Sequence, residues 1–543
     1  MENNNNEGKV LLSGFNNVVE FKIPDWNQDA IKNMKKTPLY KNAAKPSNLL
    51  KSTNKIMLDQ SISTNGWDTV SICRVSALNA QIKVAKTYPE SMDITEPGST
   101  ISVNGEFDAW QVVTGGDGKN VKINVPFKNG VYRGIQFNGQ DTFDLAGSSV
   151  DILVKLQYFP LPEPSIADGE YNLYINAEGA TPTEPIAAVI NLHVENEYMD
   201  DINKSILKGE VEKWLNIPEN LKKFDTLFST ININNMGEGS EQFSWLRATS
   251  ISYAYTDIGT EDTSTFGILC MTNHRSCAGL PNQLPAVSLK EDNNALFVIS
   301  REIFVRYQLF PSLPYIFPGS SQADYTIDKT GLTINAKKLK LDDVKVGAIY
   351  YHPVADDFEI TFDETYIRTT TKVSCEISPG IVSHTVIVTK QTLIMDVNSN
   401  GEKIMSYEMV GDPEISNSVE TSPGIIVTEV ILGLIGAVVT AIAACVAGPI
   451  VALVIGIIAA LVVAIVSITI HVIIEKVIAE GIQDAVPSIE PMVKIASSQI
   501  KWPFCCEGGL DLTNIDYLGA LIFEGNLAID ESFQLKEGRL ISA

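Results

Sequence analysis

The chain has 543 residues, of which 45% are apolar and 20% are charged. These proportions exclude a disordered chain and a fibrous repeat, and they provide for at least one large core. Lys and Arg number 41 against 65 Asp and Glu, a net charge of −24 that argues against a nucleic-acid partner.

The N-terminal segment, residues 1–60, differs in charge from the rest. Residues 1–56 hold nine Lys and five acidic residues, so they carry +4 while the remainder carries −28. We predict a basic, partly mobile arm that lies on the acidic body or touches an anionic membrane surface. No apolar stretch follows a basic start, so the sequence shows no Sec signal.

The next segment, residues 61–425, is dominated by alternating apolar and polar residues. The pattern is clear at Val121–Val125, Val150–Leu156 and Phe358–Phe362, and it is typical of half-buried antiparallel strands. Two helices are expected within this β-rich body, which could contain two subdomains. One begins near Trp67 with Asp68 as its cap, and the other covers Met199–Leu221.

The strongest signal is an uncharged run of 45 residues from Val430 to Ile474. Small residues recur every four positions in each half of the run, and this period marks one face of a helix that can approach another helix closely. We therefore predict an apolar antiparallel helical hairpin at 426–482, with its turn at Gly448-Pro449. The small-residue stripes are Gly433, Ala437 and Ala441 in the first half, and Ala452, Gly456, Ala460 and Ala464 in the second.

The flanks of this run differ from those of a permanent membrane span. Lys476 is the only basic residue close to it, and no aromatic belt borders either end. The pattern favours a hairpin that is buried in the protein or that inserts into a membrane conditionally.

No catalytic motif is recognisable in the sequence. Its five histidines and seven cysteines form no metal-binding spacing, and no nucleotide-binding loop is present. We expect no catalytic residues, no metal and no cofactor, and hence a protein that is not an enzyme.

Three patches resemble one known family. They are Asn65-Gly66-Trp67-Asp68, the apolar run 430–474, and Trp502-Pro503 followed by Leu518–Phe523. Together they resemble the OrfX-type and forty-seven-kilodalton protein family of botulinum neurotoxin gene clusters, over roughly residues 60–543. The N-terminal arm departs from that pattern.

The resemblance implies an α+β tubular lipid-binding (TULIP) fold. In such a fold, long curved antiparallel sheets wrap around long helices and enclose an elongated apolar groove. Strands in 483–543 would complete this body. The scattered, odd-numbered cysteines and the missing Sec signal predict synthesis in a bacterial cytoplasm, with any release by a non-classical route. The resemblance implies a role in toxin loci, some of them linked to insecticidal activity.

Three functions follow as hypotheses. The first is nonenzymatic binding of a lipid or fatty acid in an elongated groove. The second is a membrane-inserting or pore-forming toxin component that uses the 430–474 hairpin. The third is an accessory protein that shields the apolar surface of a partner, such as a co-encoded toxin-cluster protein.

Overall fold

The structure is a computed structural model of the chain. It describes residues 18–19, 24–34, 61–95, 98–159, 169–175, 185–232, 240–285, 287, 289–317, 319–425, 427, 429–466, 472–473, 476–477, 480, 482–503 and 505–529. Most of the N-terminal arm predicted at 1–60 therefore lies outside the described residues.

The chain forms two compact units whose sequences interleave. Unit 1 comprises Met1–Ile62, Ser300–Met492 and Asn514–Ile522, and unit 2 comprises Ser63–Ile299, Val493–Thr513 and Phe523–Ala543. The sequence boundaries expected at 425/426 and 482/483 both fall inside unit 1. Four elements contribute residues to both units: β16 (Ala295–Ser300), α11 (Glu490–Ser497), β27 (Cys505–Tyr517) and β28 (Ala520–Ile529).

Unit 1 is built on an antiparallel sheet in the order β17-β18-β21-β22-β23, and β23 also pairs with β24 and β25. Burial alternates along β22 and most of β23, so one face of this sheet is buried. The strands are β17 (Tyr325–Ile327), β18 (Thr333–Lys340), β19 (Val344–Val346), β20 (Ile349–Tyr351), β21 (Val354–Phe362), β22 (Ile367–Ser378), β23 (Ile381–Val397), β24 (Lys403–Met409), β25 (Glu414–Thr421) and β1 (Val18–Val19), which pairs with β25.

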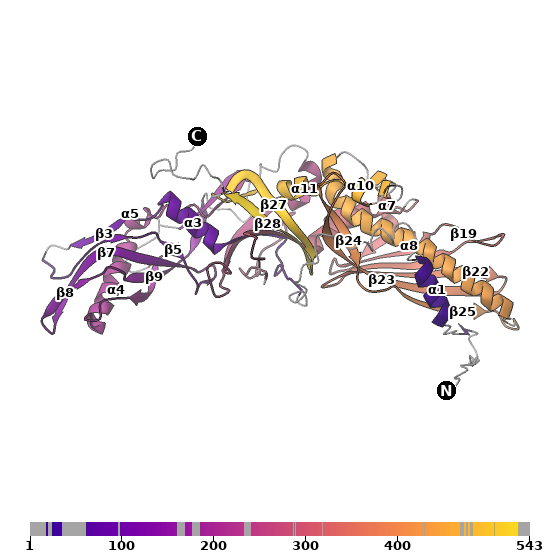
Figure 1. The fold of residues 1–543 in the computed structure, drawn as a ribbon, viewed down its shortest axis with the longest axis horizontal. Coiled ribbons are helices and arrows are strands. Elements are labelled where there is room, and N and C mark those ends of the chain that lie inside the picture. The colour runs from indigo at the N-terminus through magenta and orange to yellow at the C-terminus, as the bar shows by residue number, and fades with distance from the viewer. Residues whose placement is uncertain are drawn as a thin grey trace, which may run out of the picture. The chain divides into compact units, whose positions relative to one another are not determined.

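The helices of unit 1 gather on the buried face. Figure 1 shows α8 (Glu429–Val466) running along the sheet with α1 (Pro24–Met34) beside it, and α8 packs against β22, β23 and β24. The other described helices of unit 1 are α6 (Arg301–Ile303), the π-helix η3 (Phe304–Leu309), α7 (Phe310–Ile316), the 3-10 helix η4 (Gln322–Asp324) and α10 (Ile482–Ala485).

The predicted helical hairpin is wrong, because α8 is one helix of 38 residues that continues through Gly448 and Pro449. A proline within a helix removes one backbone hydrogen bond but keeps a helical φ. The residue before a proline is restricted in part through its Cβ atom, which Gly448 lacks. The surrounding run also offers no charged residues for an exposed loop, so continuing the helix leaves fewer backbone groups without partners.

The expected fold class also needs correction. The structure is β-rich with large antiparallel sheets, but α8 lies along one face of its sheet and the strands do not wrap around it. Val430 is 82% exposed and Gly433 and Ala437 are exposed, so one side of the helix has no covering strand among the described residues.

Unit 2 contains three sheet regions. Seven strands form the order β12-β9-β7-β4-β3 with β5 and β8 on β7, four form β10-β11-β13-β26, and a third region has the order β16-β2-β15-β14-β6. The strands are β2 (Thr69–Arg74), β3 (Ser91–Thr95), β4 (Ser102–Phe107), β5 (Gln111–Val112), β6 (Asp117–Gly118), β7 (Val121–Phe137), β8 (Gln140–Asp144), β9 (Ser149–Val154), β10 (Leu156–Phe159), β11 (Glu170–Ile175), β12 (Ala188–His193), β13 (Ser229–Asn232), β14 (Ala248–Thr256), β15 (Thr265–Thr272), β16 (Ala295–Ser300) and β26 (Ile500–Lys501). Its helices are α3 (Val75–Ala85), α4 (Asp201–Leu215), α5 (Pro218–Leu221) and the 3-10 helix η2 (Ser240–Leu246).

The local predictions had mixed outcomes in unit 2. The helical stretch Met199–Leu221 is confirmed as α4 and α5, and Asp200 caps α4 by accepting hydrogen bonds from the backbone N–H groups of Ile202 and Asn203. The helix predicted from Trp67 is wrong at its start, because Thr69–Arg74 is strand β2 and the helix begins at Val75. β2 pairs with β15 on one side and β16 on the other, and the residues on both of its faces are buried, so it shows no strand alternation.

Candidate functional site

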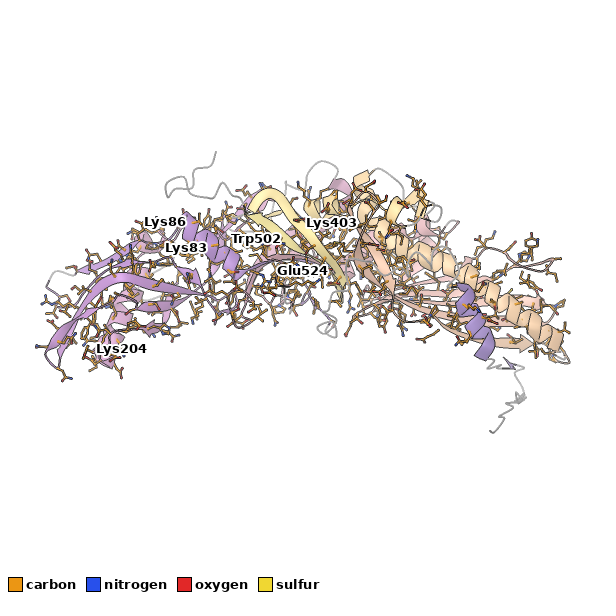
Figure 2. The ribbon with its side chains drawn as sticks, in the orientation of Figure 1. Lys83, Lys86, Lys204, Lys403, Trp502 and Glu524 are labelled. Carbon is orange, nitrogen blue, oxygen red and sulfur yellow. The ribbon has the colours of Figure 1, made fainter. Side chains whose placement is uncertain are left out.

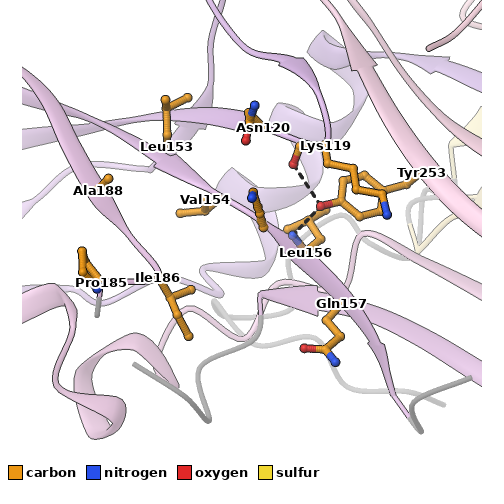
Figure 3. Close-up of a pocket in the computed structure, with 11 residues that line it drawn as sticks. Lys119, Asn120, Leu153, Val154, Leu156, Gln157, Pro185, Ile186, Ala188 and Tyr253 are labelled. Atoms are coloured by element: carbon orange, nitrogen blue, oxygen red, sulfur yellow. Dashed lines mark hydrogen bonds between the residues drawn. The ribbon is translucent and has the colours of Figure 1, made fainter. Parts of the chain in front are cut away.

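A cavity of about 710 Å³ opens in unit 2 where the chain passes from β9 into β10. This volume lies within the usual range of small-molecule sites. Figure 3 shows the side chains that line it: Lys119, Asn120, Leu153, Val154, Lys155, Leu156, Gln157, Pro185, Ile186, Ala188 and Tyr253. We call this cavity the unit 2 pocket.

Sheet register explains how the pocket acquires an apolar floor. Leu153 of β9 pairs with Ala188 of β12 on one side and with Lys122 of β7 on the other. Residues directly opposite one another in antiparallel strands project to the same face. Leu153 and Ala188 therefore form part of a floor that Leu156 and Ile186 extend, while the turn at Lys119 and Asn120 precedes β7.

Tyr253 of β14 fixes one wall of the pocket. Its hydroxyl donates to the carbonyl of Lys119 at 3.0 Å and accepts from the backbone N–H of Leu156 at 2.7 Å (Figure 3). Burial raises the pKa of Tyr253 to about 12, so the hydroxyl stays protonated at neutral pH. One neutral side chain thereby joins the two backbone segments that carry the pocket's lysines.

The pocket is cationic, although the chain as a whole is strongly acidic. Lys119 and Lys155 line it, both are exposed, and the described lining includes no Asp or Glu. The neighbouring Lys122 differs, because its ammonium lies 3.0 Å from Asp151 and is neutralised there. Lys119 and Lys155 thus contribute the positive charge available to a ligand.

Asp151 is the centre of a polar cluster on the same sheet face. Burial alone would raise the pKa of its carboxyl group, but hydrogen bonds from Asn124, Lys122, His193 and Asn191 lower that pKa to about 2. Asp151 therefore remains ionised at neutral pH and is held by its neighbours in unit 2.

An aromatic row links the pocket to one of the family-motif residues. Trp502 is 5% exposed and its ring meets that of Phe266 edge-on, with centroids 6.2 Å apart. Phe266 in turn stacks on Tyr253 at 6.0 Å. Trp502 therefore supports the pocket wall without lining it, and Pro503 follows it at a half-buried position.

The other motif, Asn65-Gly66-Trp67-Asp68, forms a turn of unit 2 outside the pocket lining, with Trp67 and Asp68 buried. Asn65 and Gly66 have φ values of +54° and +89°, and the N–H of Trp67 donates to the carbonyl of Thr64 at 3.0 Å. This is the conformation of a type I′ turn, which favours Asn-Gly. A side chain at Gly66 would be strained by the positive φ, and its Cβ atom would lie 2.7 Å from the end of the Leu280 side chain, which would have to shift.

That turn directs two side chains inward. The indole N–H of Trp67 donates to the carbonyl of Pro281 at 2.8 Å. Asp68 is fully buried, accepts hydrogen bonds from the backbone and hydroxyl of Thr272 at 2.7 and 3.0 Å, and pairs with Arg275. These contacts hold the loop after β15, which indicates a structural role for this motif.

The small-residue positions of α8 do not come together as two facing stripes. Gly433 and Ala437 are exposed and Ala441 is half-buried, whereas Gly456 is buried. Gly448, Pro449, Ala452, Ala460 and Ala464 lie in the same helix, and their side chains are outside the described part.

The buried side of α8 lies on a sheet face that carries hydroxyl groups. Ile435, Val438, Val439 and Ile442 are completely buried on α8, which packs on β22 and β23. Facing inward on these strands are Thr369, Thr371, Ser383 and Thr385, each at most 1% exposed, whose hydroxyls find no hydrogen-bond partner among the described residues. We call these four residues the hydroxyl row.

Other classes of site are absent from the described residues. They contain no group of three or more His, Cys, Asp or Glu side chains placed to hold a metal ion. Where side chains are described, no helix offers an apolar stretch long enough to cross a membrane.

The unit 2 pocket could not be predicted from the sequence. Its lining comes from four separate stretches, near residues 119, 155, 186 and 253, and no local motif connects them. The one available signal was Lys155, a charged residue between Val154 and Leu156 in an otherwise buried run.

The structure thus defines a β-rich protein of two units with an open cationic pocket in one of them. The OrfX-like family, described as Protein OrfX2/OrfX3/P47, matches residues 64–525, and the chain belongs to this family. This confirms the resemblance to a family associated with clostridial toxin clusters.

Individual relatives support this membership. Protein OrfX3 of Paraclostridium bifermentans is 30% identical over 501 residues, covering 86% of this chain and 99% of the relative. Protein OrfX3 of Clostridium botulinum (strain Kyoto / Type A2) is 25% identical over 402 residues, covering 68% and 81%. The solved structure of P47 from C. botulinum A2 has a TM-score of 0.56 at 16% identity and covers 86% of this chain and 98% of its own, a likeness of fold.

Proposed function

We propose that this chain is a nonenzymatic accessory protein of a toxin cluster that binds an anionic amphiphile, such as a fatty acid, in the unit 2 pocket. The observation that carries the proposal is the combination of an apolar floor with two lysines and no described acidic lining residue, in a chain of net charge −24. A co-encoded protein of the same cluster is the proposed source or recipient of the ligand.

The chemistry of the lining matches such a ligand. An alkyl chain gains from nondirectional contact with Leu153, Leu156 and Ile186 and requires no catalytic group. A carboxylate gains from charge-assisted contacts with Lys119 and Lys155, which strengthen because no described lining carboxylate competes for them.

Calorimetric titration with laurate tests the proposal. We expect saturable binding, and we expect the double variant Lys119→Gln/Lys155→Gln to bind about tenfold more weakly or worse, because each lost charged contact is worth ~1 kcal/mol or more. Dodecanol, which has the same chain without the charge, should bind wild type and the double variant alike.

The matched control is Lys83→Gln/Lys204→Gln. These lysines lie on α3 and α4 of the same unit, outside the pocket lining (Figure 2). The control should bind laurate like wild type. Absence of binding to wild type, or equal weakening by both double variants, would contradict the proposal.

A further inference from the structure

Strands β19 and β20 of unit 1 form a hairpin that pairs with no other described strand. Its register joins Val344 to Tyr351, Lys345 to Tyr350 and Val346 to Ile349, with Gly347 and Ala348 in the turn. Gly347 has a φ of +63°, which a tight two-residue turn requires at this position.

The hairpin is anchored at its base and free at its tip. Val344 and Tyr351 are 5% and 4% exposed, since β19 packs on α8 and β20 on β22. Ile349 and Tyr350, at the other end, are 55% and 57% exposed. Ile349 is thus an exposed apolar residue at the tip of the hairpin, outside the core of unit 1.

Polarity changes in a fixed order along the hairpin. The tip, Val346–Ile349, has only apolar side chains and glycine. One step back, the ammonium of Lys345 lies 5.2 Å from the ring centroid of Tyr350. The charged residues Asp342 and Asp343 lie at the base, where Asp343 contacts His352 at 2.6 Å.

We propose that this tip, Val346–Tyr350, inserts into the surface of a lipid bilayer. A bilayer changes from hydrocarbon through a polar interface to water. The hairpin follows the same order, with apolar residues at its end, then a tyrosine and a lysine, and then carboxylates. A stable protein partner usually covers ~800 Å² and 20 to 30 residues on each side, far more than a five-residue tip offers. The inference is independent of the unit 2 pocket.

Flotation of the full chain with phosphatidylcholine vesicles tests this proposal. Wild type should float with the vesicles, and Ile349→Asp should lower the partition coefficient about tenfold or more, because a charge replaces the inserted apolar group. The matched control is Ile202→Asp, the same change at a 63% exposed isoleucine in the first turn of α4, and it should float like wild type.

Several outcomes would overturn the proposal. They are a wild type that does not float, an Ile349→Asp variant that floats like wild type, and equal losses for both aspartate variants. Capture of a protein by wild type but not by Ile349→Asp, without flotation, would assign the tip to a protein partner instead. Laurate binding by Ile349→Asp should remain intact. Failure of the bilayer proposal can therefore be distinguished from failure of the ligand proposed for the unit 2 pocket.

Discussion

The unit 2 pocket and the face beneath α8 each bring polar groups against apolar surface, but only one of them is open. In unit 1 α8 packs on the two strands that carry the hydroxyl row, and the row is buried by the chain itself. In unit 2 the sheet face carrying Leu153 and Ala188 is partly open, since both residues are half-buried, and it is bordered by Lys119 and Lys155.

This difference shows that an apolar segment of the sequence need not be a ligand-binding site. The described part of the most apolar segment packs one side on the protein's own sheet, so its apolar composition does not by itself indicate a lipid groove. The second hypothesis, membrane insertion, was built on a hairpin that the structure does not contain. The ligand site we propose lies in a region of ordinary composition.

The largest expected effect is on the stability of unit 1, where α8 is proposed to cover the sheet permanently. Ile442→Asp places a charge on a fully buried position against β22 and β23, and we expect a loss of ~3 to 5 kcal/mol in the free energy of unfolding of unit 1. Urea denaturation monitored by circular dichroism measures the change.

The control for this prediction is Ala437→Asp, on the exposed side of the same helix. It should change the free energy of unfolding by only ~0.5 kcal/mol. Similar losses from both variants would mean that α8 has no distinct buried and exposed sides, and the comparison between the two regions would fail.

A smaller effect, of opposite sign, is expected in the hydroxyl row. Thr371→Val and Thr385→Val preserve side-chain shape and remove buried hydroxyls that have no described partner, so each should raise the free energy of unfolding by ~1 kcal/mol. Thr370→Val, on the opposite, half-buried face of β22, serves as the neutral control. Destabilisation by both buried substitutions would show that the hydroxyls are hydrogen-bonded after all.

A further effect concerns acid stability beside the pocket. The folded state lowers the pKa of Asp151 from 3.8 to about 2, so its contribution to stability is present above pH 3.8 and is lost as the pH falls toward 2. In Asp151→Asn this part of the pH dependence should disappear. Unfolding curves across this window that decline equally for wild type and variant would contradict the assignment.

Much of the secondary structure could be predicted from the sequence, because its signals are local. Val121–Val125 and Phe358–Phe362 lie in β7 and β21, where alternation reflects one buried and one exposed face. The prediction failed at Thr69–Arg74, since a strand paired on both sides and buried on both faces has no alternation to detect.

The site could not be predicted in the same way. Tyr253 reaches Lys119 and Leu156 only through the pairing of distant strands, and a single sequence contains no record of that pairing. The motif residues Trp67 and Asp68 were correctly associated with the family, but their contacts are with a buried loop rather than with the pocket. A distinctive motif can therefore identify a fold without marking its ligand site.

The most direct test of the central claim is photo-crosslinking of the full chain with a diazirine-bearing fatty acid, followed by mass-spectrometric mapping of the labelled peptides. The account predicts label on the segments around residues 119, 153–157 and 185–188, and its loss in Lys119→Gln/Lys155→Gln. Label concentrated on residues 430–466 of α8 would contradict it, because that result would place the lipid where the protein's own sheet is proposed to be the permanent partner.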